Sequence, residues 1–141
     1  MADLKMFIDD ETELKQLLTE WKERLALSDW CIYARFCTPD EFSDTNNAGQ
    51  CSTDWVNKNA VILLRRPDCT PSGQIQRQAQ EAVLIHELLH CKFMSFENNH
   101  ALIEDAAFEV TQHGLLEDMA KALYCAKYSL KRSFFTDVML E

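Results

Sequence analysis

Apolar residues recur every three or four positions near the start of the chain, between Asp10 and Leu27. This spacing predicts an amphipathic helix with one face turned to a core. Asp10 or Thr12 is placed to cap it, and acidic residues crowd its first turn, where they favour the helix dipole. The apolar positions of this stretch are Leu14, Leu17, Leu18, Trp21 and Leu25.

The next segments change to the patterns of β-strands. In "DWCIYARFC" (29–37) alternate residues are apolar from Trp30 to Phe36, which predicts one strand. After the turn-rich "TPDEFSDTNNAG", residues 50–67 indicate a hairpin: a strand over 53–56, a polar turn at 57–59 and a second strand "AVILL" (60–64). The unbroken apolar run of that second strand predicts burial on both of its faces.

Two long helices are predicted in the rest of the chain, over about 74–94 and 101–127, with Asn98 and Asn99 as cap candidates for the second. The tail from about 129 to 141 has no clear pattern. A helix, strands and then two helices describe an α+β fold in which the sheet packs on helices. The length of 141 residues suits one domain, 1–141, with its own core.

The stretch "EAVLIHELLHCKFMS" (81–95) is apolar almost all round the predicted helix, yet it holds His86, Glu87 and His90. Histidines four residues apart project from the same face, so they can bind one cation while Glu87, about 100° round, reaches a water. Zinc is the expected ion, one per chain, since it accepts neutral imidazole and leaves a position open in catalytic sites. Without a metal, three buried ionisable groups would be costly to desolvate, so the motif predicts a metal site.

A third ligand has to come from farther along the chain. On a helical wheel of the last helix, Glu104 shares an apolar stripe with Phe108, Leu115, Met119 and Ala122. Glu104 is therefore predicted to face inward and to be the third ligand, unless it pairs with a cation such as Arg35. His100 is the second candidate. His113, which the wheel places with Asp105, Glu109 and Gln112 on the polar side, is the third.

The motif His86-Glu87-Leu88-Leu89-His90, with "IEDAAFE" following on the next helix, resembles the zincin metallopeptidases. Among them it is similar to compact gluzincin-like proteins of bacteria and prophages. The resemblance implies a minimal zincin-like domain: an N-terminal helix, a small twisted mixed sheet of about three strands, the histidine-motif helix and a second metal-ligand helix. It further implies that His86, His90 and Glu104 bind zinc and that Glu87 is the general base and acid.

The same resemblance implies a zinc-dependent metallopeptidase whose substrate is a protein or peptide. An extended substrate would add to an edge strand of the sheet, with "NAVILL" as the candidate strand. Family members often stabilise the oxyanion with a Tyr or His, but no spacing selects Tyr124 or Tyr128 here. A SprT-like protease with a later histidine as third ligand, such as His113, is an alternative.

A non-catalytic, zinc-stabilised binding or regulatory module is the alternative from another class. In such a module the fourth metal position would be filled by His100 or a cysteine, or covered by the tail around Phe134 and Phe135. The presence of Glu87 favours the enzyme, because a purely structural zinc site does not need a carboxylate at that position.

Composition narrows the range of partners. A formal charge of −9 and a pI near 4.9 disfavour a protein that binds nucleic acid through clustered cations. No basic segment followed by an apolar run opens the chain, and no run of about 20 apolar residues predicts a membrane span. Six cysteines without redox or zinc-ribbon spacing are expected to be reduced, mostly buried thiols in a cytoplasmic protein. The tryptophans are expected to be core or sheet anchors: Trp21, Trp30 and Trp55.

Overall fold

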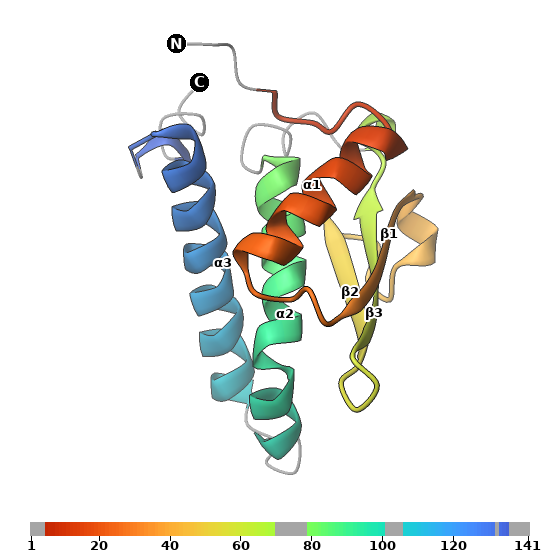
Figure 1. The fold of residues 1–141 in the computed structure, drawn as a ribbon, viewed down its shortest axis with the longest axis vertical. Coiled ribbons are helices and arrows are strands. Elements are labelled where there is room, and N and C mark those ends of the chain that lie inside the picture. Colours follow the sequence, from red (N-terminus) through yellow and green to blue (C-terminus); the bar gives the residue numbers. More distant parts are fainter. Residues whose placement is uncertain (1–4, 70–78, 101–105, 132, 136–141) are drawn as a thin grey trace.

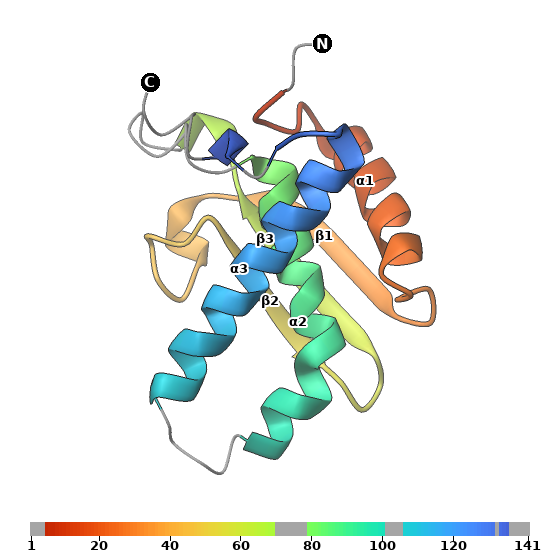
Figure 2. The ribbon, with the colours of Figure 1, turned by 90° about the vertical axis from the view of Figure 1, so that its left-hand side faces the viewer.

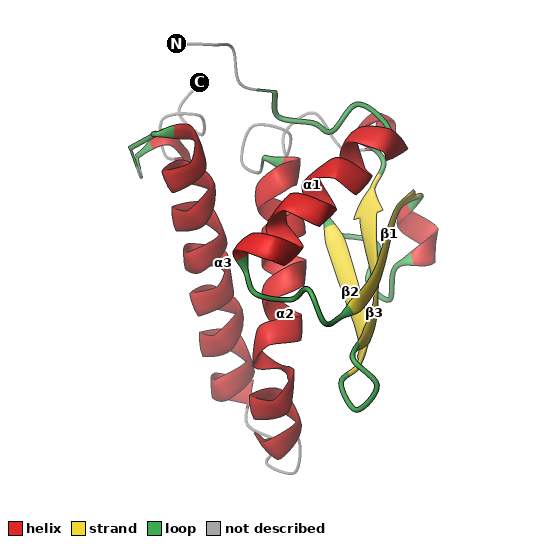
Figure 3. Ribbon diagram, viewed as in Figure 1, coloured by secondary structure: helices red, strands yellow, loops and turns green. Residues whose placement is uncertain are grey.

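The computed structural model describes residues 5–69, 79–100, 106–131 and 133–135, with the side chains of 94–100 and 106–109 outside the description. Within that part of the chain, three long helices and a three-stranded mixed sheet form an α+β fold that begins with a helix, as predicted (Figures 1 and 3). The elements follow in the order α1 (Glu11–Arg24), β1 (Cys31–Cys37), the 3-10 helix η1 (Pro39–Glu41), β2 (Gly49–Asp54), β3 (Asn59–Arg65), the 3-10 helix η2 (Pro67–Cys69), α2 (Gln80–His100) and α3 (Ala106–Tyr128).

Helix α1 forms where the apolar spacing predicted it. The Asp10 side chain accepts a hydrogen bond of 2.8 Å from the backbone N–H of Glu13, which caps the first turn. Leu14, Leu18 and Trp21 are buried at i, i+4 and i+7, so a single face of the helix joins the core.

The sheet has the strand order β1-β3-β2. Strand β3 is parallel to β1, with Ala34 beside Ile62, and antiparallel to β2, with Cys51 on its other side. The predicted hairpin is thus confirmed, although its first strand begins at Gly49 and the turn starts directly after Asp54. β3 is the central strand, so the expectation that "NAVILL" forms the sheet's edge is wrong.

Burial along β3 alternates, contrary to the burial on both faces that its apolar run predicted. Ala60, Ile62 and Leu64 are buried, whereas Val61 is 43% exposed. The cause is the layering: α1 packs on β1, and α2 packs on β2 and β3, on the same face of the sheet (Figure 1). Of the two faces, this one alone is covered by the helices that the structure describes.

Helix α3 packs against α2, and the two run side by side in opposite directions (Figures 1 and 2). Helix α2 continues through Asn98 and Asn99, so these residues do not cap α3. The buried stripe of α3 consists of Leu116, Ala120 and Tyr124. The predicted stripe through Leu115 is wrong, because Leu115 is 51% exposed. Leu115 and Leu116 are both apolar and about 100° apart, so the wheel could not distinguish the two faces.

Glu81 joins the three helices through a buried polar network. Its carboxylate accepts hydrogen bonds from Trp21 Nε1 of α1 (2.8 Å), from Lys127 Nζ of α3 (2.6 Å) and from the Tyr128 hydroxyl. Burying a carboxylate costs free energy of desolvation, and the cation and the two further donors offset that cost. The network therefore fixes how α2 sits between α1 and α3, and with it the registry of the two long helices.

Several smaller expectations have mixed outcomes. Trp21 and Trp30 are buried, but Trp55 lies in the turn between β2 and β3 and is 45% exposed. All six cysteines lie in the described part of the chain and none forms a disulfide; Cys37, Cys91 and Cys125 are the buried ones. None of the described helices combines the length and apolarity needed for a bilayer span.

Candidate metal centre

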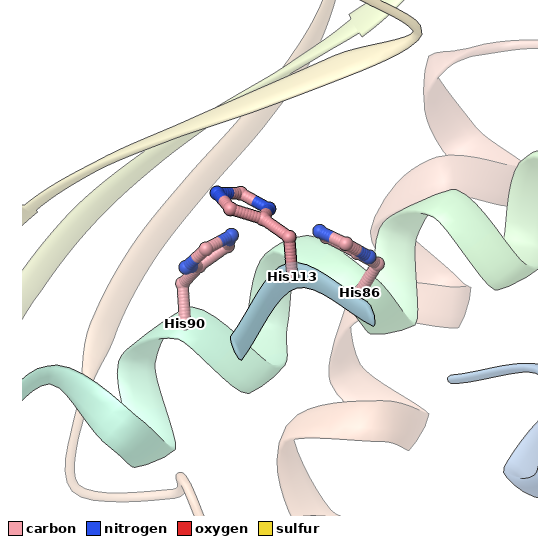
Figure 4. Close-up of side chains that lie close together, drawn as sticks. All are labelled: His86, His90 and His113. Atoms are coloured by element: carbon pink, nitrogen blue, oxygen red, sulfur yellow. The ribbon is translucent and has the colours of Figure 1, made fainter. Parts of the chain in front are cut away.

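His86 and His90 lie one turn apart on α2 and present their rings on the same face of that helix, as the motif predicted (Figure 4). Their ring centroids are 5.2 Å apart. The apolar neighbours in the sequence account for this placement: Leu84, Ile85, Leu88 and Leu89 are buried and anchor α2 in the core, which leaves the two histidines at the border of a pocket.

His113 of α3 completes the cluster. Its ring centroid lies 5.8 Å from that of His86 and 5.3 Å from that of His90, and Figure 4 shows the three rings close together, two from α2 and one from α3. One ligand nitrogen from each of the three histidines lies within 4.8 Å of the others, and among the described residues this is a group that could hold a metal ion. His113 was only the third candidate in the sequence, and it is the candidate that the structure brings to the motif.

The side chains of the two other candidates for third ligand lie outside the description. Glu104 lies outside the described residues, and His100 is the last residue of α2 with its side chain outside the description. The stripe that pointed Glu104 inward is, at Leu115, a solvent-facing side of α3. Arg35, the alternative partner considered for Glu104, forms an ion pair with Glu41 at 2.9 Å.

Glu87 is buried beside the histidines, with 6% of its surface exposed. This burial raises the pKa of the Glu87 carboxyl, although the neighbouring His86 and His90 act in the opposite direction. Strand β2 approaches the carboxylate so closely that a Cβ atom at Gly49 would lie 3.1 Å from Glu87 Oε2 and 2.8 Å from Val83 Cγ1. The absence of a side chain at Gly49 therefore lets β2 and α2 meet at the site.

A pocket of about 650 Å³ opens over these residues. Its floor consists of α2 and α3 side chains, and its wall is formed by residues 47–52 of the loop before β2 and of β2 itself, together with Ser43. The lining residues on the helices are Val83, His86, Glu87, His90, His113 and Glu117. Three imidazoles and two carboxylates thus share one open pocket.

Glu117, one turn after His113 on α3, was not predicted. Its Oε2 atom lies 2.9 Å from His86 Nδ1. His86 Nδ1 is buried and is not aligned for a hydrogen bond to any acceptor. Its contact with Glu117 is therefore an ion pair. The pair holds the pKa of Glu117 below its usual range. Burial would lower the pKa of His86, but Glu117 and Glu87 raise it overall. The spacing His113-x-x-x-Glu117, which puts the two residues on one face of the helix, was the feature of the sequence that could have indicated Glu117.

The two tyrosines considered for an oxyanion role lie elsewhere. Tyr124 is buried and packs against Phe135, and Tyr128 bonds to Glu81; both line a different pocket, next to α1. Phe134 and Phe135 contact Tyr124, and neither lines the histidine pocket. The described part of the tail therefore does not cover the histidines.

Comparisons with known proteins give no further guidance: no family model, no curated protein and no solved structure matches this chain. What the chain does has to be inferred from the geometry of the site.

Proposed function

We propose that the protein is a zinc-dependent metallopeptidase whose metal ligands are His86, His90 and His113 and whose general base is Glu87. The observation that carries the proposal is the meeting of three imidazoles within ligand distance of one another, with a buried carboxylate of raised pKa in the same open pocket. Catalytic zinc sites commonly use three protein ligands and leave one position open.

The donor set fits zinc. Neutral imidazole nitrogen is a preferred zinc ligand, with Zn–N distances of about 2.0–2.1 Å, and tetrahedral ligand atoms then lie about 3.3 Å apart. The three nitrogens here lie within 4.8 Å, so small side-chain rotations bring them to that spacing. Two of the histidines are held by a helix in the core, while the exposed His113 has room to adjust.

When bound, zinc would acidify a water molecule and polarise the scissile carbonyl. The chain's own contribution is the Glu87 carboxylate, which accepts the proton of the attacking water and returns it to the leaving amine. Burial raises the pKa of this carboxyl, which makes it a stronger acceptor for the proton of the water.

Strand β2 offers a place for the substrate. β2 is an edge strand of the described sheet, paired with β3 on one side, and Gly49–Ser52 line the histidine pocket. An extended peptide could add to this edge and lie beside Glu87. The proposed partner of the substrate strand is therefore β2 instead of the central strand β3.

A third histidine also bears on the resemblance to known peptidases. A glutamate ligand is implied by the gluzincin-like resemblance, whereas a later histidine is implied by the SprT-like one. The described cluster favours the second pattern at the metal. The SprT-like resemblance would also imply a role linked to DNA, and the net charge of −9 argues against that role.

The direct test of the proposal is removal of the metal. Zinc-loaded protein is expected to cleave an unfolded protein such as casein, to lose the activity on treatment with a chelator, and to regain it when zinc is restored. Peptide release is the measurement, and circular dichroism monitors the fold throughout. Cleavage that persists in the metal-free protein would contradict the proposal.

Gly49→Ala is expected to lower kcat/KM by about 100-fold while zinc stays bound, because a displacement near 1 Å at a reacting group can cost that much. The added methyl group would displace Val83 and Glu87, to which its three nearest atoms belong. Gly114→Ala is the matched control, since a Cβ there meets nothing within 4 Å and alanine favours the helix. Equal activity of the two variants would show that close packing at Gly49 does not position Glu87.

A further inference from the structure

The metal pocket is built from two pairs of side chains on antiparallel helices. Helix α2 supplies His86 and His90, one turn apart, and α3 supplies His113 and Glu117, also one turn apart. Because the helices run in opposite directions, His113 lies beside His90, with ring centroids 5.3 Å apart, and Glu117 lies beside His86. Glu117, the fourth of these residues, is not one of the three candidate metal ligands.

We propose that Glu117 is a positioning residue that holds the His86 imidazole with its proton on Nδ1 and its Nε2 toward the metal. The inference rests on the metal site of the proposed function, but it does not depend on peptide cleavage. Its basis is the 2.9 Å separation of Glu117 Oε2 from the buried Nδ1 atom of His86. A carboxylate at that distance is a strong acceptor for an imidazole N–H, and a small rotation aligns the two.

Glu117 acts on His86 rather than on the metal because of where its two oxygens lie. The group of ligand atoms within 4.8 Å of one another contains the three histidines, and Glu117 is not part of it. Its second oxygen, Oε1, lies 3.5 Å from Lys121 Nζ, one turn farther along α3. That ammonium lies 5.3 Å from the ring centroid of the buried Phe135.

These contacts form a chain from Phe135 through Lys121 and Glu117 to His86. Lys121 Nζ lies 3.5 Å from Oε1 of the carboxylate, whose Oε2 lies 2.9 Å from Nδ1 of His86. With Nδ1 engaged by Glu117, Nε2 is the nitrogen left to bind a metal. A histidine ligand whose other nitrogen donates to a carboxylate has a fixed orientation and greater basicity. Loss of that partner commonly weakens metal binding by about 10–100-fold.

The experiment measures the zinc affinity of the full chain by competition with a chromophoric chelator. Glu117→Ala is expected to weaken zinc binding by about 10–100-fold. Glu117→Gln keeps an acceptor oxygen without the charge and should lie between Glu117→Ala and the wild type. Asp118→Asn is the matched control: it removes an equal charge from the exposed neighbouring position of the same helix and should leave the affinity close to that of the wild type. Circular dichroism verifies that all variants are folded.

A second readout separates positioning from a general structural effect. In the zinc-loaded wild type, long-range ¹H–¹⁵N correlation spectra should show His86 protonated at Nδ1 and bound to zinc through Nε2. Zinc on Nδ1 would overturn the inference, and so would wild-type affinity in Glu117→Ala or an equal loss in Asp118→Asn. If Glu117→Ala weakens zinc binding in a protein that cleaves nothing, the positioning role stands and the peptidase proposal fails. If the wild type binds no zinc, both fail.

Discussion

Glu87→Gln is expected to reduce peptide cleavage by about 10²–10⁴-fold, the range that a general base contributes to such reactions. The substitution keeps the shape of the side chain, which fits between α2 and Gly49, and it removes only the ability to accept and return a proton. Zinc binding should persist, because the ligands His86, His90 and His113 are unchanged. The measurement is the initial rate of casein cleavage at equal zinc occupancy.

Glu23→Gln is a suitable control for that experiment, since it makes the same isosteric change at an exposed position of α1, away from the histidine pocket, and should retain full activity. A Glu87→Gln variant that cleaves at the wild-type rate would contradict the assigned role of Glu87. A variant that loses both activity and zinc would show instead that Glu87 supports the metal site and would leave the base unassigned.

Patterns of residues close together in the sequence predict much of the fold. The cap at Asp10 and the spacing of Leu14, Leu18 and Trp21 specify α1, and the apolar run with its polar turn specifies the β2–β3 hairpin. The position of β3 in the sheet does not follow, because its parallel pairing with β1 joins segments far apart in the chain. The described helices cover one face of β3, because α1 and α2 pack on the same side of the sheet. The apolar run alone therefore wrongly predicted a strand buried on both faces.

The candidate site likewise has a part that the sequence predicts and a part that it does not. His86, Glu87 and His90 lie on one helix, so their spacing alone places them together. The third histidine depends on how α3 is rotated against α2, and that rotation is set by Leu116, Ala120 and Tyr124 and by the Glu81 network. With Leu115 equally apolar, the sequence could not select the buried side. Gly49 and Glu117 come from contacts across elements that no local pattern records.

His113→Ala is expected to weaken zinc binding by more than about 100-fold, because loss of a ligand should exceed the roughly 10–100-fold effect of losing a partner of a ligand. His113 is exposed, so its truncation leaves the core of α3 intact and the effect can be assigned to the metal. Activity should fall with zinc occupancy and recover in part at high zinc concentration. Competition with a chromophoric chelator gives the affinity, and thermal unfolding monitors the fold.

The measurement that tests the account most directly is that same zinc titration carried out on His113→Ala, Glu104→Ala and His100→Ala side by side with the wild type. All three positions were candidates for the third ligand, and only His113 lies in the described cluster. One zinc per chain in the wild type, lost in His113→Ala and retained with near wild-type affinity in the other two variants, is the predicted result. Loss of zinc in Glu104→Ala with full binding in His113→Ala would contradict the three-histidine site.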